Sequence, residues 1–298
     1  MGTFDPDAGF ADGGTYGVPV NTFPTWRERS ILALTNAVRL SPTAYKQSAF
    51  YGAGSPSLNT TTVLSATYPA RGPLNSQYEL NQSSRQHATE MANFNYFAHN
   101  SLDGGSAFQR IGSYYSLSGS QGENIAAGNL DPIATMHQWL CDQAGSACCD
   151  DGATCDGHRR NIMSSNYRAV GNGYAKSASS TYTHYWTQDF GGVSSVMVPP
   201  LADGTHLLVG TQTRFIANVS ATAAVQSVTV VLADVTMPMA IDLGTASKGT
   251  WFVSAARGSG CRPYFFVATD SAGTNWRYPA TGQFQTTGEG TCTQEYTP

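Results

Sequence analysis

Residues 157–163 read GHRRNIM, and residues 122–128 read GENIAAG. Each stretch contains one candidate for metal binding or acid–base chemistry, His158 in the first and Glu123 in the second. His158 stands where a helix is expected to begin. Imidazole and carboxylate side chains are the groups that proteins use for divalent-metal binding and for acid–base chemistry. These two stretches therefore predict part of a functional site.

Two further groups of the same kinds occur in other segments. His99 stands in FAHNSLDGG, after a long helical pattern, and Asp142 follows a shorter helical pattern that contains Trp139. Side chains from separate loops and helix ends can point into one shared cavity. We therefore expect a single site lined by His99, Glu123, Asp142 and His158, with the two histidines as metal ligands and the two acids as catalytic groups.

The composition excludes several classes of protein. The chain has 298 residues, of which 41% are hydrophobic and only 12% charged, with a net charge of -4. A disordered chain has a high charge and few apolar residues, and a nucleic-acid-binding protein has a basic surface. No apolar run reaches the length of a membrane span. We therefore expect a globular protein that neither binds nucleic acid nor crosses a membrane.

The six cysteines indicate an oxidising compartment. They fall into two groups, Cys141, Cys148, Cys149 and Cys155 in the first and Cys261 and Cys292 in the second. An even number without a CxxC pair favours disulfides over a zinc cluster. Residues 1–10 read MGTFDPDAGF and lack the basic and apolar regions of a signal peptide. We expect a protein that is secreted or lies in the cell envelope, with its leader absent from this sequence.

The chain changes character along its length. Residues 1–25 are rich in Gly, Asp and Pro and predict an extended arm, and residues 26–192 carry helical patterns followed by strand patterns. Residues 193–204, which contain Pro199 and Pro200, predict a linker. Short strand patterns separated by turn residues fill 205–298, which is typical of a β-sandwich of the immunoglobulin or fibronectin kind, with Cys261 bonded to Cys292.

Between residues 27 and 192 the motifs occur in a recognisable order. They are Asn36-x-x-Arg39-x-x-Pro42, Leu80-x3-Ser84-x2-His87-Ala88-x2-Met91, Phe97-x-His99, Gly122-Glu123-Asn124-Ile125-Ala126, Trp139, Gly157-His158-Arg159-x-Asn161-Ile162, Val170-Gly171-x-Gly173 and Tyr185-Trp186-Thr187-Gln188-x-Phe190-Gly191. This string resembles the bacterial type of the CAP superfamily, whose SCP-like domain also occurs in cysteine-rich secretory proteins, plant pathogenesis-related proteins and insect venom allergens.

The resemblance implies an α–β–α sandwich with a cavity of two histidines and two acids, which in some members binds zinc. His99, Glu123 and His158 match the family motifs directly. The fourth position is Asp142 if it follows the family's Trp-x-x-Glu pattern, with Asp156 as the competitor.

The segment between Trp139 and Gly157 is about thirteen residues longer than the short bacterial pattern. It is acidic and cysteine-rich, with too little apolar content for a core, so disulfides must order it. Adjacent cysteines rarely bond each other. This leaves two pairings open: Cys141–Cys148 with Cys149–Cys155, or Cys141–Cys149 with Cys148–Cys155. The carboxylates of Asp150, Asp151 and Asp156 are candidate calcium ligands, although their spacing does not match an EF-hand.

Three functions are compatible with these features. The first is non-catalytic binding of an extracellular ligand, such as a lipid, a sterol or a surface component, with a divalent-metal site that takes Zn²⁺. The second is a metal-dependent peptidase or esterase that uses the same cavity. The third is adhesion through the C-terminal β-sandwich. The absence of a GxSxG or HExxH motif favours the first.

Overall fold

The computed structural model describes residues 16–116, 119–143, 145–192 and 198–298. The chain divides into two compact units, one of residues 41–195 and one of residues 196–298 together with the segment that ends at Leu40. Among the described residues, no helix has the length and apolar character needed to cross a membrane.

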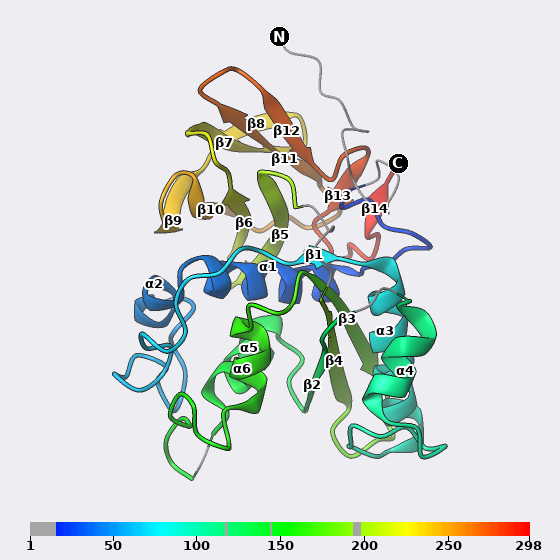
Figure 1. The fold of residues 1–298 in the computed structure, drawn as a ribbon. Coiled ribbons are helices and arrows are strands. Elements are labelled where there is room, and N and C mark those ends of the chain that lie inside the picture. Colours follow the sequence, from blue (N-terminus) through cyan, green and yellow to red (C-terminus); the bar gives the residue numbers. More distant parts are fainter. Residues whose placement is uncertain (1–15, 117–118, 144, 193–197) are drawn as a thin grey trace. The chain divides into compact units, whose positions relative to one another are not determined.

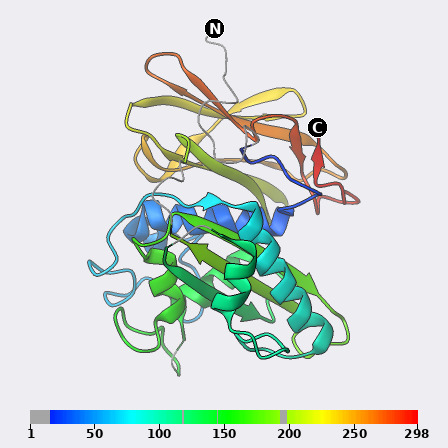
Figure 2. The same cartoon turned by 45° about the vertical axis from the view of Figure 1, so that its right-hand side comes forward.

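Residues 41–195 form a small sheet with helices on both of its faces (Figure 1). The elements are α2 (Pro42–Gln47), β1 (Asn75–Ser76), α3 (Tyr78–Phe94), α4 (Ala107–Tyr114), β2 (Gln121–Ala127), α5 (Pro132–Cys141), α6 (Gly157–Met163), β3 (Ala169–Lys176) and β4 (His184–Gly191). The strand order is β1-β3-β4-β2, so β2 is an edge strand. Helices α3 and α4, which come forward in Figure 2, cover one face, and α5 and α6 lie on the other. This is the predicted α–β–α layering.

Two glycines in β3 allow α3 to lie close to the sheet. A Cβ atom on Gly171 would lie 2.0 Å from the backbone of Leu80, and one on Gly173 would lie 2.3 Å from the backbone of Ser84. Both distances are far below van der Waals contact, so only glycine fits at these positions. The approach buries the apolar side of α3 against β3 and β4.

Capping side chains define where α4 and α5 begin. Asp131 accepts a hydrogen bond from the backbone N–H of Ile133, so α5 starts at Pro132 as its sequence predicts. Helix α4 has a reciprocal capping box between Ser106 and Gln109. The spacing Ser-x-x-Gln is the sequence signature of this cap. Helix α4 is absent from the predicted elements, although this signature is present in the sequence.

The second unit contains helix α1 (Trp26–Leu40) and two antiparallel sheets. The strands are β5 (Leu201–Val209), β6 (Gln212–Ser220), β7 (Val225–Leu232), β8 (Val235–Pro238), β9 (Ala240–Gly244), β10 (Lys248–Ala256), β11 (Pro263–Asp270), β12 (Asn275–Tyr278), β13 (Gln283–Gln285) and β14 (Tyr296–Thr297). One sheet has the order β5-β6-β10-β9 and the other β14-β13-β11-β7-β8, with β12 beside β11. The predicted all-β region is confirmed, and its immunoglobulin or fibronectin topology stays a prediction.

Helix α1 packs on β5, β6 and β10 through a buried polar network. The two carboxylate oxygens of Asp203 accept hydrogen bonds from Asn36 and Asn218, each at 2.7 Å. Burial raises the pKa of Asp203 to about 7, although the two amide donors act against it. The sequence patterns place residues 26–40 in one domain with the residues up to 192. In the structure, these polar contacts join α1 to the strands of the second unit.

Parts of the predicted arm and linker are ordered within the β unit. The ring of Tyr16 is buried against Tyr278, and its hydroxyl donates to the backbone oxygen of Ala202. Strand β5 begins at Leu201, inside the predicted linker 193–204, because Leu201 and Ala202 are buried in spite of the nearby turn residues. Residues 1–15 of the arm and 193–197 of the linker lie outside the described residues.

All six cysteines form disulfides, as predicted. The bonds are Cys141–Cys148, Cys149–Cys155 and Cys261–Cys292. Of the two pairings that the sequence left open in the first group, the structure has the one that joins the first cysteine to the second and the third to the fourth. No free thiol is left, so the zinc-cluster alternative is wrong.

Candidate functional site

A cavity of about 400 Å³ lies in the unit of residues 41–195, at the edge strand β2. Its lining includes all four side chains that the sequence singled out: His99, Glu123, Asp142 and His158. They come from four different segments. Successive side chains of a strand point to opposite faces, so Glu123 reaches toward α4 while Asn124 contacts α6. The cavity therefore collects groups from both helical layers.

The first pair in the cavity is His99 with Glu123. The Nδ1 atom of His99 lies 2.8 Å from the Oε1 atom of Glu123. The side chain of Glu123 is only 2% exposed, whereas that of His99 is 54% exposed. The buried carboxylate thus accepts from Nδ1 and fixes the ring, while the imidazole remains accessible to solvent.

Arg110 of α4 holds this first pair in place. Its guanidinium forms an ion pair with the second carboxylate oxygen of Glu123, and it also donates to the backbone oxygen of His99 and to the hydroxyl of Ser101 at 2.7 Å. Burial alone raises the pKa of Glu123, but the hydrogen bond from His99 and the charge of Arg110 outweigh it and keep this pKa below its ordinary value. Glu123 is therefore ionised at neutral pH.

The second pair is His158 with Asp142. Asp142 ends α5 in the left-handed backbone conformation, with a φ of 47°, which aspartate tolerates better than most residues. Its Oδ1 atom contacts the Nδ1 atom of His158, and its Oδ2 atom accepts the backbone N–H of His158 at 2.9 Å and that of Arg159 at 3.3 Å. One carboxylate thus orients the imidazole and caps the first turn of α6.

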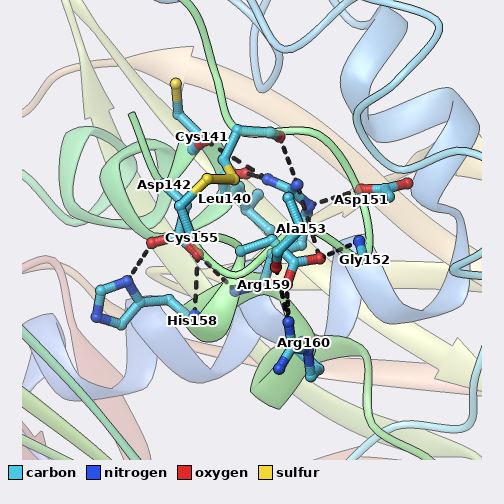
Figure 3. The surroundings of a disulfide bond; sticks show 12 residues. Leu140, Cys141, Asp142, Asp151, Gly152, Ala153, Cys155, His158, Arg159 and Arg160 are labelled. Atoms are coloured by element: carbon cyan, nitrogen blue, oxygen red, sulfur yellow. Dashed lines mark hydrogen bonds and ion pairs between the residues drawn. A yellow bond between two sulfur atoms is a disulfide. The ribbon is translucent and has the colours of Figure 1, made fainter. Parts of the chain in front are cut away.

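Arg159 fixes the backbone around this second pair (Figure 3). Its side chain is fully buried and donates to the backbone oxygens of Leu140 and Cys149. It also pairs with Asp151, at 2.7 Å from Nε to Oδ1. Arg159 therefore joins the end of α5, the cysteine-rich insert and α6. The sequence indicates Arg159 only as part of a motif and does not indicate Arg110, because burial of a single arginine is not visible in a sequence.

The three candidate calcium ligands already have other roles or face solvent. Asp151 and Asp156 lie on either side of the Arg159 guanidinium, and Asp156 also pairs with Arg160 and accepts from Tyr68. Asp150 is exposed. The positive charge that neutralises the two buried acids is thus an arginine. Asp156 does not line the cavity, which leaves Asp142 as the fourth group.

The donor chemistry of the cavity fits a metal ion in one respect. A histidine that binds a metal nearly always donates its other ring N–H to a carboxylate or carbonyl. Both His99 and His158 have Nδ1 on a carboxylate, so Nε2 is the ring atom available to a ligand. Among the described residues, however, no three His, Cys, Asp or Glu side chains are grouped so that they share one ion. The arrangement thus offers two imidazoles rather than a complete ligand set.

A further acid lies behind Glu123. Asp189 of β4 is the direct cross-strand neighbour of Glu123, is fully buried, and accepts from the hydroxyl of Ser83 at 2.6 Å. Burial and the adjacent charge of Glu123 raise the pKa of Asp189 well above its ordinary value. Asp189 therefore loses its proton less readily than an exposed aspartic acid, beside the ionised Glu123.

Comparison with known proteins identifies relatives of this unit. A model of the cysteine-rich secretory protein family, CAP, matches residues 32–190. "Uncharacterized protein YkwD" of Bacillus subtilis (strain 168) is 32% identical over 120 residues, which is 40% of this chain and 40% of that protein. The match thus spans less than half the length of this curated relative.

Solved structures also resemble the chain. An extracellular protein containing a SCP domain from Bacillus anthracis str. Ames is 25% identical and has a TM-score of 0.30, over 41% of this chain and 33% of that one. An outer surface protein from Borrelia burgdorferi is 18% identical with a TM-score of 0.32, over 40% of this chain and 77% of that one.

Proposed function

The chain belongs to the cysteine-rich secretory protein family, CAP, and we propose that it is an extracellular binding protein whose ligand occupies the cavity of the two His–carboxylate pairs. The observation that carries this proposal is the pairing itself. In each pair a buried carboxylate orients an imidazole that solvent can reach. Such preorganised polar groups bind a ligand without an entropic cost for ordering them.

We propose further that His99 and His158 bind a divalent ion, with zinc as the best match for imidazole ligands. A bound ion would supply a positive charge that attracts carboxylate or carbonyl groups of the ligand. Two protein ligands leave positions open for water or for the ligand itself. The polar lining suits a surface component with polar groups better than a lipid or a sterol.

A location outside the cytoplasm is part of the proposal. Three disulfides are typical of oxidising compartments. The related SCP-domain protein from Bacillus anthracis is described as extracellular.

Hydrolysis in the same cavity is the second candidate, because oriented imidazoles also serve acid–base catalysis. The contacts and the pKa of Glu123 make it a poor general base for such a reaction. Its carboxylate is occupied by His99 and Arg110, and its pKa is held below the ordinary value, so it is a weak proton acceptor. Turnover of a casein or ester substrate that is lost on chelation would favour hydrolysis over binding.

Calorimetric titration with zinc tests the metal part of the proposal. We expect the wild type to bind zinc, and the double variant His99→Ala with His158→Ala to lose binding without unfolding. His184→Ala is the matched control, since His184 does not line the cavity. Because a proton and a metal ion compete for the same ring nitrogen, zinc binding should weaken in acid. Equal affinities of the wild type and the double variant would overturn the proposal.

A further inference from the structure

A second and larger cavity lies beside the first, in the same unit. It has a volume of about 760 Å³ and follows α5, with residues 53–55 on another side. Asp142 and His158 line both cavities. We name this second cavity the α5 groove. It is large enough for a ligand of several residues or rings.

The cysteine-rich insert forms one wall of the α5 groove. Cys141 and Cys155, one from each disulfide of the insert, belong to its lining. The short bacterial pattern lacks about thirteen residues in this segment, so the insert is an addition to that pattern. The two disulfides keep the wall in place where an insert with so few apolar residues would otherwise be loose.

The charge of the α5 groove is negative. Asp131 precedes the first residue of α5 and is exposed, so its carboxylate faces the groove entrance without a basic partner in the lining. Asp142 follows the last residue of α5, and its carboxylate is already bonded to His158 and to the backbone N–H groups of α6. None of the residues that line the groove is a lysine or an arginine. Burial lowers the pKa of His137, the histidine in the middle of α5, so it adds no charge at neutral pH. The groove therefore favours a cationic ligand and disfavours an anion.

The length and the remaining side chains favour a peptide. Helix α5 has 10 residues, and so it spans about 15 Å, which is the length of about four residues of extended chain. Asn129 donates to the side-chain oxygen of Gln138 at 2.8 Å, which leaves the Asn129 oxygen and the Gln138 N–H groups to pair with a peptide backbone. Ala134 leaves room above the helix. The lining contains no Phe, Tyr or Trp ring on which a sugar or a base would stack.

We propose that the α5 groove is a second binding site, which takes a short peptide segment with basic side chains, extended along α5 between Asp131 and Asp142. The proposal rests on the proposed function only in treating the protein as a binding protein. It requires no metal ion and no ligand in the first cavity.

Fluorescence polarisation with labelled tetrapeptides tests this inference on the full chain. An acetylated and amidated Ala-Lys-Ala-Lys peptide should bind, and the matching Ala-Glu-Ala-Glu peptide should bind at least about tenfold more weakly. Asp131→Asn should lower the affinity for the lysine peptide about fivefold, the usual effect of one exposed ion pair. Asparagine caps a helix as well as aspartate does, so this variant keeps α5 intact.

Two further variants make the result decisive. Ala134→Phe should block the α5 groove and abolish binding of the lysine peptide. Glu79→Gln removes an exposed acid at the start of α3, outside the groove, and should bind like the wild type. Equal binding of the two peptides, or equal effects of Asp131→Asn and Glu79→Gln, would overturn the inference.

The zinc experiment separates this inference from the proposed function. His99 lines the first cavity and not the α5 groove. We expect His99→Ala to weaken zinc binding and to leave peptide binding unchanged. Zinc binding without peptide binding would remove only the second site, and peptide binding without zinc binding would remove only the metal site.

Discussion

The two His–carboxylate pairs have the same final contact but are held by different means. Glu123 sits on a strand, is buried, and is kept in place by the charge of Arg110. Asp142 sits at the end of a helix and is kept in place by backbone N–H groups of α6, with Arg159 and two disulfides bracing the chain around it. One pair depends on a charge next to the acid, and the other depends on the path of the backbone. The two pairs should therefore fail under different conditions.

The largest expected effect belongs to the second pair. Arg159→Leu leaves Asp151 without its ion pair and leaves the backbone oxygens of Leu140 and Cys149 without a donor. We expect a loss of about 4 kcal/mol in the free energy of unfolding, as for other broken buried pairs. Urea denaturation measures it. Arg160→Leu, on the exposed neighbouring side chain, is the control and should cost about 1 kcal/mol or less. Similar losses of stability for both variants would mean that Arg159 does not hold the chain around the His158–Asp142 pair.

The first pair should be sensitive to Arg110. Arg110→Met leaves the carboxylate of Glu123 buried with only His99 to compensate it, and we expect a loss of about 3 kcal/mol at pH 7. Adding Glu123→Gln should recover much of this loss, because the buried charge is then removed. Thermal unfolding of the two variants and the wild type measures both effects. Failure of the double variant to recover would mean that Arg110 acts through the backbone of His99 instead.

Removal of one disulfide should distinguish the two pairs. Replacing Cys141 and Cys148 by serine opens the insert, and we expect a cost of about 2 kcal/mol, with faster hydrogen exchange in residues 141–163. Residues 121–127, which carry Glu123, should exchange as in the wild type. Serine at Cys261 and Cys292, in the other unit, is the control and should leave both segments unchanged. Equal loosening of both segments would contradict the comparison.

The smallest expected effect is a dependence on pH. The folded-state pKa of Glu123 lies below its unfolded value, so its contribution to stability is fully present above about pH 4.3 and is lost as the pH falls through the folded-state pKa. The pH dependence of unfolding below that value should become weaker in Glu123→Gln. Urea midpoints at pH 3 and pH 6 measure it. The same pH dependence in the wild type and in Glu123→Gln would show that protonation of Glu123 does not change the free energy of unfolding.

Sequence patterns predicted the elements whose stability is local. The spacing of apolar residues between Trp26 and Leu40 matches the bounds of α1, and the pair Asp131-Pro132, a helix-start signal, stands where α5 begins. The apolar and aromatic runs at 170–175 and 184–190 lie in β3 and β4. Local patterns also led to one omission, since the capping box of α4 was overlooked. Strand β2 was treated only as a motif, because as an edge strand of small and polar residues it lacks the alternation by which strands are recognised.

The sequence by itself determined the kinds of side chain in the site, the family resemblance and the even set of cysteines. The order of His99, Glu123, Asp142 and His158 along the chain was enough to predict one shared cavity. The kinds of side chain, the family resemblance and the number of cysteines follow from residue identity and spacing alone.

Only the tertiary structure decided which acid faces which histidine, how the four clustered cysteines pair, and which arginines are buried beside the site. Each of these is a choice among chemically equivalent partners. The free energy that selects one partner comes from burial and from contacts between separate segments, as between Arg110 and Glu123, 13 residues apart, or between Asp142 and His158, 16 residues apart. Nothing in the local sequence of either member of such a pair records the identity of the other.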